Sequence, residues 1–222
     1  MRRYRVNNIF YSLQGEGRNT GRAAVFIRFA GCNLRCPFCD TEFDSYREMS
    51  AEEIIIEAET AIGGKTAGHT FPLVVLTGGE PTLQVDEAFV DLLHQQGYEV
   101  AMESNGTRPA PKNLDWLTVS PKNHGLTRLD LSHDSTWLDM KLPNEIKIVF
   151  DENTNPEAIL SELYRVEPWP ESSRVESWLY LQPCDTGDAE RNKAITQACV
   201  EYIKQHPQWR LSLQTHKLID IE

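Results

Sequence analysis

Short apolar runs typical of strands alternate with helix-like segments along most of this 222-residue chain. The run Leu73-Val-Val-Leu-Thr77 is continuously apolar, as expected for a strand that is buried on both faces of a sheet. A helix is predicted over 85–96, where Phe89, Leu92 and Leu93 are spaced for burial on one side. This alternation is typical of βα units arranged around a mainly parallel sheet.

The rest of the chain repeats this pattern. Ser50 and Glu53 form a capping-box pair, which predicts the start of a helix that ends before Gly63. Further helices are predicted near 155–165 and over 188–206, and further strands at 24–30, 98–103, 116–119, 145–150, 178–182 and 209–213. About six βα units are too few for an eight-stranded barrel. We therefore expect an α/β fold, a partial, open βα barrel that forms a single domain over residues 1–222. Segment 121–143 has no clean period and is expected to be irregular.

Composition excludes several classes of protein. A formal net charge of −11 argues against a general nucleic-acid binder, which needs a basic surface. No stretch approaches the ~20 apolar residues that cross a bilayer, and no apolar stretch of signal length follows the basic first residues. Five cysteines, three of them in one short loop, do not indicate a disulfide framework. We expect a reduced, cytoplasmic protein with no membrane or nucleic-acid partner.

The three crowded cysteines are Cys32, Cys36 and Cys39, in a C-x3-C-x2-C spacing. A complete ferredoxin-type 4Fe–4S site takes four cysteines, so a set of three leaves one iron free to bind a reactant. Two other readings remain open on the cysteines alone. One is a structural zinc site with a distant fourth ligand, and the other is a group of unligated core cysteines.

Three chemically loaded loops follow predicted strands. The cysteines follow strand 24–30, Gly78-Gly79-Glu80-Pro81 follows strand 73–77, and Ser120-Pro121-Lys122 follows strand 116–119. The carboxyl ends of parallel strands share one edge of a sheet, which predicts a single active site there. Taken alone, either of the last two loops would be read as a simple turn.

Together these motifs resemble those of the radical S-adenosylmethionine enzymes. Cys32, Cys36, Phe38 and Cys39 match the family's C-x3-C-x-aromatic-C pattern, and 78–81 match its GGEP-like strand end. The resemblance implies a 4Fe–4S cluster held by the three cysteines. It also implies that S-adenosylmethionine chelates the open iron through its methionine amino and carboxylate groups and is cleaved reductively to start radical chemistry.

The whole chain resembles one branch of these enzymes, the 7-carboxy-7-deazaguanine synthase family. The segments that carry this are Leu13-Gln-Gly-Glu-Gly17, Phe26-Ile-Arg28, Cys39-Asp-Thr41, Glu103-Ser-Asn-Gly-Thr107 and Leu213-Gln-Thr-His-Lys217. The implied reaction converts 6-carboxy-5,6,7,8-tetrahydropterin into 7-carboxy-7-deazaguanine and ammonia, in queuosine (7-deazapurine) biosynthesis. Hydrogen abstraction at C6, ring contraction and return of the hydrogen would regenerate S-adenosylmethionine.

The resemblance also implies which residues bind the cofactors. Phe38 is expected to lie against the adenine, unless it merely covers the cluster, and Gly78 and Gly79 allow close backbone approach to the methionine end. Thr41 is the position that matches a Mg²⁺ ligand. The other expected contacts to S-adenosylmethionine are Asp40, Glu103, Ser104, Ser120, Pro121, Lys122 and Gln182.

For the substrate, Arg28 offers a planar fork of donors suited to a carboxylate. Its place in an apolar strand makes an unpaired charge costly, so an internal ion pair with Glu16 or Glu103 is the alternative. The other expected substrate contacts are Leu13, Gln14, Gly15, Glu16, Thr77, His216 and the terminal carboxylate, here on Glu222. A backbone carbonyl is an equally good partner for His216.

Partners and alternatives complete the expectations. An electron donor such as flavodoxin or ferredoxin and a homodimer are implied by the family. The rival enzyme is a glycyl-radical-enzyme activase, and the rival without catalysis is a zinc-stapled binding module. Cys199 is expected to be a core thiol, while Cys184 is the one place for a fourth cluster ligand.

Overall fold

The computed structural model describes residues 2–39, 41–42, 44–64, 72–122, 142–165 and 178–221. The strands are β1 Tyr4–Leu13, β2 Ala23–Phe29, β3 Arg47–Met49, β4 Leu73–Gly78, β5 Val100–Ser104, β6 Trp116–Val119, β7 Glu145–Phe150, β8 Trp178–Pro183 and β9 Trp209–Leu211. The α-helices are α1 Ala51–Ala61, α2 Glu87–Gln95, α3 Pro156–Arg165, α4 Ala189–Gln205 and α5 Thr215–Leu218. Two 3-10 helices, η1 Gly17–Asn19 and η2 Pro81–Leu83, complete the elements of the described residues.

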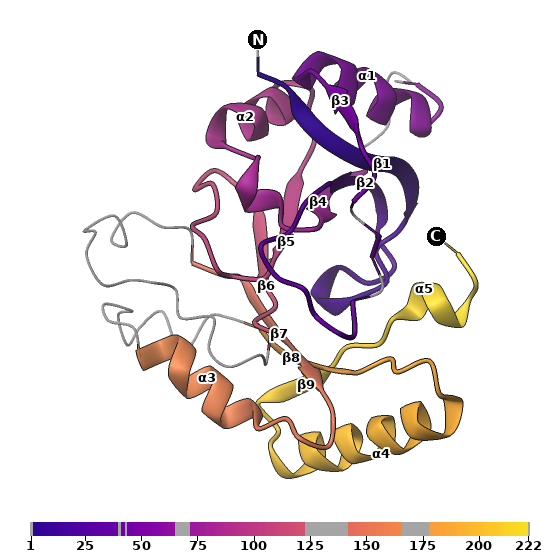
Figure 1. Cartoon of the computed structure of the whole chain (residues 1–222), viewed down its shortest axis with the longest axis vertical. Helices are drawn as coiled ribbons and strands as arrows, with labels where there is room; N and C mark the ends of the chain where they lie inside the picture. Colours follow the sequence, from indigo (N-terminus) through magenta and orange to yellow (C-terminus); the bar gives the residue numbers. More distant parts are fainter. Residues whose placement is uncertain are drawn as a thin grey trace.

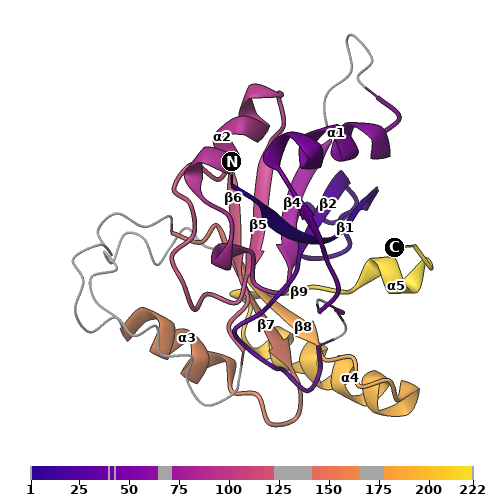
Figure 2. The same ribbon diagram turned by 45° about the horizontal axis from the view of Figure 1, so that its top comes forward.

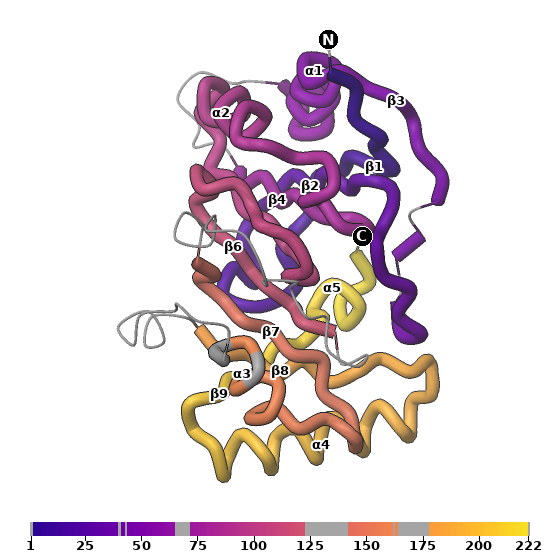
Figure 3. Tube along the Cα trace, turned by 60° about the vertical axis from the view of Figure 1, so that its left-hand side comes forward, coloured from indigo at the N-terminus to yellow at the C-terminus, as the bar shows by residue number. Residues whose placement is uncertain are grey.

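All nine strands form one open sheet in the order β3-β1-β2-β4-β5-β6-β7-β8-β9. The seven strands from β2 to β9 in this order are all parallel to one another. Strand β1 lies between β2 and β3 and is antiparallel to both. Figure 3 follows this row of strands across the molecule, from β1 to β9. The expected open, mainly parallel α/β fold is confirmed.

Side chains that point alternately to the two faces of each strand build the core. On the helix-covered face, Val25, Ile27 and Phe29 of β2 pack with α1 and α2 in one apolar cluster. A second cluster joins β7, β8 and β9 to α3 and α4, and it contains Cys199, which is fully buried as expected. Figure 1 shows the two helix pairs at opposite ends of the sheet.

For most helices and strands, the bounds predicted from sequence lie within two or three residues of those in the structure. The Ser50 hydroxyl accepts a hydrogen bond from the backbone N–H of Glu53, and the Glu53 carboxylate accepts one from the backbone N–H of Ser50, so the expected capping box is present. Of the segment 121–143, residues 123–141 lie outside the described part of the chain.

Strand β1 was not expected from the sequence. Its alternation is interrupted by a register shift between Val6 and Asn8, and two asparagines stand at that point. Asparagine is depleted in strands, and a bulge reverses the phase of the pattern that identifies one. The short elements β3 and α5 were also missed, since they are three and four residues long.

The segment after β1 and the segment after β9 are hydrogen-bonded to each other. The backbone N–H of Thr215 donates to the carbonyl of Gly15 over 3.0 Å, and that of Gly17 donates to Ser212 Oγ over 3.0 Å. A Cβ on Gly15 would overlap the His216 ring, so a larger residue there would displace His216. Figure 2 shows α5 beside the ends of β1 and β2. Among the described helices, none is both long and apolar enough to cross a bilayer.

Candidate active site

A cavity of about 420 Å³ opens at the carboxyl ends of the parallel strands. Its floor is formed by the strand side chains that point to the face of the sheet opposite the helices. Near the amino ends this face is apolar, with Val75 and Ala101 in a small buried cluster. Two residues further along the same strands it becomes polar, at Thr77 and Glu103, and Arg28 is in register with Thr77.

All three thiols of the cysteine loop line this cavity, and none is in a disulfide. The backbone N–H of Leu34 donates to Cys32 Sγ over 3.4 Å, and Asn105 Nδ2 approaches the same sulfur at 3.9 Å. The Cys39 thiol donates to the Thr41 carbonyl oxygen at 3.6 Å. Donors directed at sulfur are one of the means by which a protein tunes a cluster.

The two glycines at the end of β4, Gly78 and Gly79, bring the cysteine loop and β4 into direct backbone contact. Gly78 has φ +114°, and a Cβ there would overlap the backbone of Phe29. A Cβ on Gly79 would overlap the carbonyl group of Gly31 and lie 3.1 Å from Cys32 N. The backbone N–H of Glu80 donates to the same carbonyl over 2.9 Å. The glycines therefore serve the chain's own packing, in addition to the cofactor contact expected from sequence.

Glu80 is fully buried and links this loop to β5. Its carboxylate accepts from Thr82 Oγ1 at 2.6 Å, from Ser104 Oγ at 2.9 Å and from the backbone N–H of Asn105 at 2.7 Å. The Asn105 side chain in turn donates to Asn33 Oδ1 at 3.0 Å. Because a buried carboxylate is costly unless it is hydrogen-bonded, this set of donors fixes the cavity wall beside Cys32.

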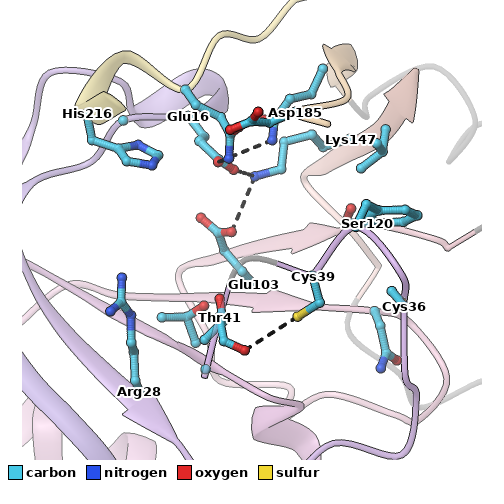
Figure 4. A pocket seen from close by; sticks show the side chains of 18 of the residues that line it. Glu16, Arg28, Cys36, Cys39, Thr41, Glu103, Ser120, Lys147, Asp185 and His216 are labelled. Carbon is cyan, nitrogen blue, oxygen red and sulfur yellow. Dashed lines mark hydrogen bonds and ion pairs between the residues drawn. The ribbon is translucent and has the colours of Figure 1, made fainter. Parts of the chain in front are cut away.

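A charged cluster forms the opposite wall, as Figure 4 shows. The ammonium of Lys147, on β7, forms ion pairs with Glu16 and Glu103, the latter at 3.3 Å. The Lys147 side chain is only 4% exposed. Burial alone lowers the pKa of Lys147, but Glu103 and Glu16 outweigh it and the pKa lies above its ordinary value. Lys147 is therefore a fixed positive charge.

Three glutamines extend this cluster. Gln14 Nε2 donates to Glu103 Oε1 at 2.8 Å, while Gln182 and Gln214 donate to Glu16 Oε1 at 3.2 and 3.0 Å. Burial raises the pKa of Glu16, but Lys147, Gln214 and His216 together lower it more, and the net pKa is below the ordinary value. Glu16 is thus ionised at neutral pH.

Arg28 lies across the cavity from this cluster in Figure 4. Its guanidinium stacks over the Phe10 ring with 4.6 Å between its carbon and the ring centroid, and Phe10 stacks on Phe26. A guanidinium held by stacking presents its planar edge to a ligand. The alternative expected from sequence was an ion pair of Arg28 with Glu16 or Glu103. In the structure, these two carboxylates form ion pairs with Lys147.

Lys122 Nζ donates to Ser120 Oγ at 2.9 Å, and both residues line the cavity. Burial and then the charge of Lys147 lower the pKa of Lys122 below its ordinary value. Pro121 between them is buried but is not part of the lining. Phe38 lines the cavity and packs against the apolar cluster of β7–β9.

Most residues predicted from sequence meet in this one cavity, although their roles remain predictions. Those in the lining are Leu13, Gln14, Gly15, Glu16, Arg28, Cys32, Cys36, Phe38, Cys39, Thr41, Thr77, Gly78, Gly79, Glu103, Ser104, Ser120, Lys122, Gln182 and His216. Asp40 and Glu222 lie outside the described residues. Cys184 also lines the cavity, and its thiol approaches the Asp185 carbonyl at 3.8 Å.

Sequence reasoning missed Lys147, Asn105, Phe10 and Gln214. A signal for Lys147 was present. It stands between Ile146 and Ile148 in a buried strand, where an unpaired charge is costly, as was argued for Arg28. Phe10 had no comparable signal, since its strand was not recognised. Asn105 and Gln214 stood within recognised segments but carried no distinguishing pattern.

The residues present fit the group that the cysteine motif implies. Three free thiols and two N–H donors to sulfur face one cavity, and the polar groups of Ser104, Ser120 and Gln182 lie in the same lining. Within the described ranges, no group of three or more His, Cys, Asp or Glu side chains is arranged around one metal ion.

Comparisons with known proteins agree with this site. The family model of the radical SAM superfamily matches residues 26–139, which places the chain in that class. A 7-carboxy-7-deazaguanine synthase of Bacteroides thetaiotaomicron is 43% identical over 220 residues, 98% of this chain and 98% of that protein. One of Bradyrhizobium diazoefficiens is 39% identical over 237 residues, 98% and 99% of the two chains.

Among solved structures, the crystal structure of QueE from Escherichia coli has a TM-score of 0.70 at 29% identity, covering 95% of this chain and 93% of that chain. The chain belongs to the 7-carboxy-7-deazaguanine synthase family. This membership favours the pterin enzyme over the activase and the zinc-stapled module.

The backbone contact at Gly79 yields the first prediction. Gly79→Ala should lower the free energy of unfolding by about 2 kcal/mol or more, because the added methyl displaces Gly31. It should also lower the iron content after anaerobic reconstitution, since the cysteine loop starts there. Urea unfolding and iron analysis measure both effects.

The matched control is Gly21→Ala, where a Cβ meets no atom within 4 Å. The strain of alanine at its positive φ of 84° is then the only cost, about 1 kcal/mol, and iron loading should be full. Equal iron loading of the two variants would show that the Gly79 contact does not position the cysteine loop.

Proposed function

We propose that this protein is a radical S-adenosylmethionine lyase that converts 6-carboxy-5,6,7,8-tetrahydropterin into 7-carboxy-7-deazaguanine and ammonia, a step of queuosine (7-deazapurine) biosynthesis. The observation that carries the proposal is a single cavity with three thiols along one wall and a guanidinium, carboxylates and amides along the others. Family membership over the whole chain supports the same conclusion.

The thiols of Cys32, Cys36 and Cys39 would hold a 4Fe–4S cluster. When bound, the cluster and S-adenosylmethionine supply the electron and the hydrogen-abstracting group that the reaction requires. The cofactor would then be held by backbone at Gly78 and Gly79 and by side chains at the ends of β5, β6 and β8. The supporting observation is that these strand ends converge on the cysteine loop.

For the substrate, the proposal assigns its carboxylate to Arg28 and its heterocycle to the turn that contains Gln14 and Glu16. Arg28 and Thr77 are in register at the ends of β2 and β4, so both reach the same ligand edge. Phe10 and Phe26 supply an apolar surface next to Arg28, suited to a flat ring.

Three further properties belong to the proposal. Mg²⁺ would bind at Thr41 together with the substrate carboxylate and water, because Mg²⁺ takes few protein ligands and keeps several waters. The protein would be a cytoplasmic homodimer reduced by a flavodoxin or a ferredoxin. The absence of disulfides among its five cysteines supports a reducing compartment.

The decisive experiment is anaerobic turnover of 6-carboxytetrahydropterin with reductant, S-adenosylmethionine and magnesium. We expect 7-carboxy-7-deazaguanine by mass spectrometry, without accumulation of 5′-deoxyadenosine and methionine, because the cofactor is regenerated. A cluster-loaded protein that forms no deazaguanine, or that consumes one cofactor per product, contradicts the proposal.

Replacement of the guanidinium tests the carboxylate contact. Arg28→Gln should raise the KM for the pterin by about tenfold to a hundredfold, since a hydrogen bond to a charged group contributes about 1.5–3 kcal/mol. Steady-state kinetics provide the measurement. The control Arg191→Gln removes an exposed arginine of α4 that pairs with Glu152, and it should leave KM unchanged. A wild-type KM for Arg28→Gln would show that the carboxylate binds elsewhere.

A threonine variant tests the magnesium site. Thr41→Ala should make activity less responsive to added Mg²⁺ while iron content stays normal, because only the hydroxyl is lost. Rates measured across a magnesium titration, with Thr60→Ala on α1 as the control, give the comparison. If the Mg²⁺ response of Thr41→Ala matches that of wild type, Thr41 is not a ligand.

A further inference from the structure

Lys147 is a buried cation to which no motif and no comparison assigns a role. It stands on the cavity face of β7, between Ile146 and Ile148, which point into the core on the opposite face. Its ammonium is bound to one carboxylate from the turn after β1 and another from β5. Unlike a solvated surface charge, a buried lysine with two carboxylate partners cannot be removed without leaving buried charges uncompensated.

The two carboxylates belong to different parts of the cavity. Glu16 is part of the turn assigned to the substrate, and its other oxygen accepts from Gln182 and Gln214. Glu103 is at the end of β5 on the cofactor side, and its other oxygen accepts from Gln14. Each carboxylate therefore has one oxygen on Lys147 and the other on amides from separate segments, as Figure 4 shows for the ion pairs.

We propose that Lys147 is a positioning residue that keeps Glu16 ionised and holds Glu16 and Glu103 in fixed orientation, so that the substrate and cofactor parts of the cavity are aligned with each other. This inference rests on the proposed function for the identity of the ligands. Without the ammonium, two carboxylates would share a partly buried site, and like charges in such a site cannot both remain ionised at low cost.

Other charged groups surround this cluster, among them Asp185 and Lys217, which form an ion pair with each other at 2.8 Å. Glu145 is on the same strand and accepts from the backbone N–H of Arg18, and burial raises its pKa to about 7. Lys122 follows β6, and His216 is on α5 and favours ionised Glu16. None of these replaces Lys147, because in the described part of the chain the ion pairs of Glu16 and Glu103 are formed with Lys147.

The test is Lys147→Met, which keeps an unbranched side chain one atom shorter than lysine and removes its charge. In wild type, the lowered pKa of Glu16 keeps it ionised, so the KM for the pterin should show no titration of Glu16 near neutrality. In the variant, burial raises the pKa of Glu16, so the KM should be about tenfold higher near pH 6 than near pH 8.5. Lys193→Met, an exposed lysine on α4, is the matched control and should behave as wild type.

Stability should change in the opposite direction. A carboxylate whose folded pKa is raised loses stabilisation as pH rises, and Glu145 already contributes such a fall in wild type. The unfolding free energy of Lys147→Met should therefore fall more steeply than that of wild type between about pH 6 and about pH 8.5, while substrate binding improves. A merely structural lysine would make binding and stability worsen together. Parallel trends of that kind overturn the inference.

Two further measurements keep the test decisive. Glu16→Gln combined with Lys147→Met removes both charges, and its raised KM should be independent of pH; a wild-type KM in this double variant overturns the inference, even if Lys147→Met alone does not fold. Equilibrium dialysis of S-adenosylmethionine against cluster-loaded protein should show about tenfold weaker binding to Lys147→Met near pH 6. This binding requires no turnover, so it separates failure of the inference from failure of the proposed pterin reaction.

Discussion

The contact between the ends of β2 and β4 is the constraint on which the rest of the site depends. Gly79 lies directly against the carbonyl of Gly31, and the same carbonyl accepts from the N–H of Glu80. The cysteine loop starts one residue later, so its origin is fixed by parallel strand pairing and by the lack of a side chain at Gly79. Buried Glu80 then links this point to β5. The irregular cysteine loop is thereby held in place by three parallel strands, β2, β4 and β5.

Sequence predicted the architecture well because the parallel strands are buried and their patterns are strong. The capping box at Ser50 and the apolar run from Leu73 each follow from local chemistry, and both appear as expected. The location of the site followed from the same logic, since loops after parallel strands share one edge. The individual roles came from family resemblance, and they still await the experiments described above.

The missed features depend on distant contacts. Strand β1 reads poorly because a bulge and two asparagines break its alternation, and it becomes a strand through pairing with β2 and β3. The importance of Lys147 depends on Glu16 and Glu103, which are 131 and 44 residues away in sequence. Helix α5 has only four residues and no buried side chain, so its position is set by the segment after β1.

The closure of the cavity by the segments after β1 and after β9 has a consequence for how the protein is made. Thr215 Oγ1 donates to Gly15 O across a sequence separation of 200 residues. During synthesis the first of these segments emerges long before the second, so the wall they share forms only when nearly all of the polypeptide is available. Until then the cysteine thiols face a pocket that lacks this wall. Iron and sulfide are therefore best inserted after synthesis of the chain is complete, rather than during it.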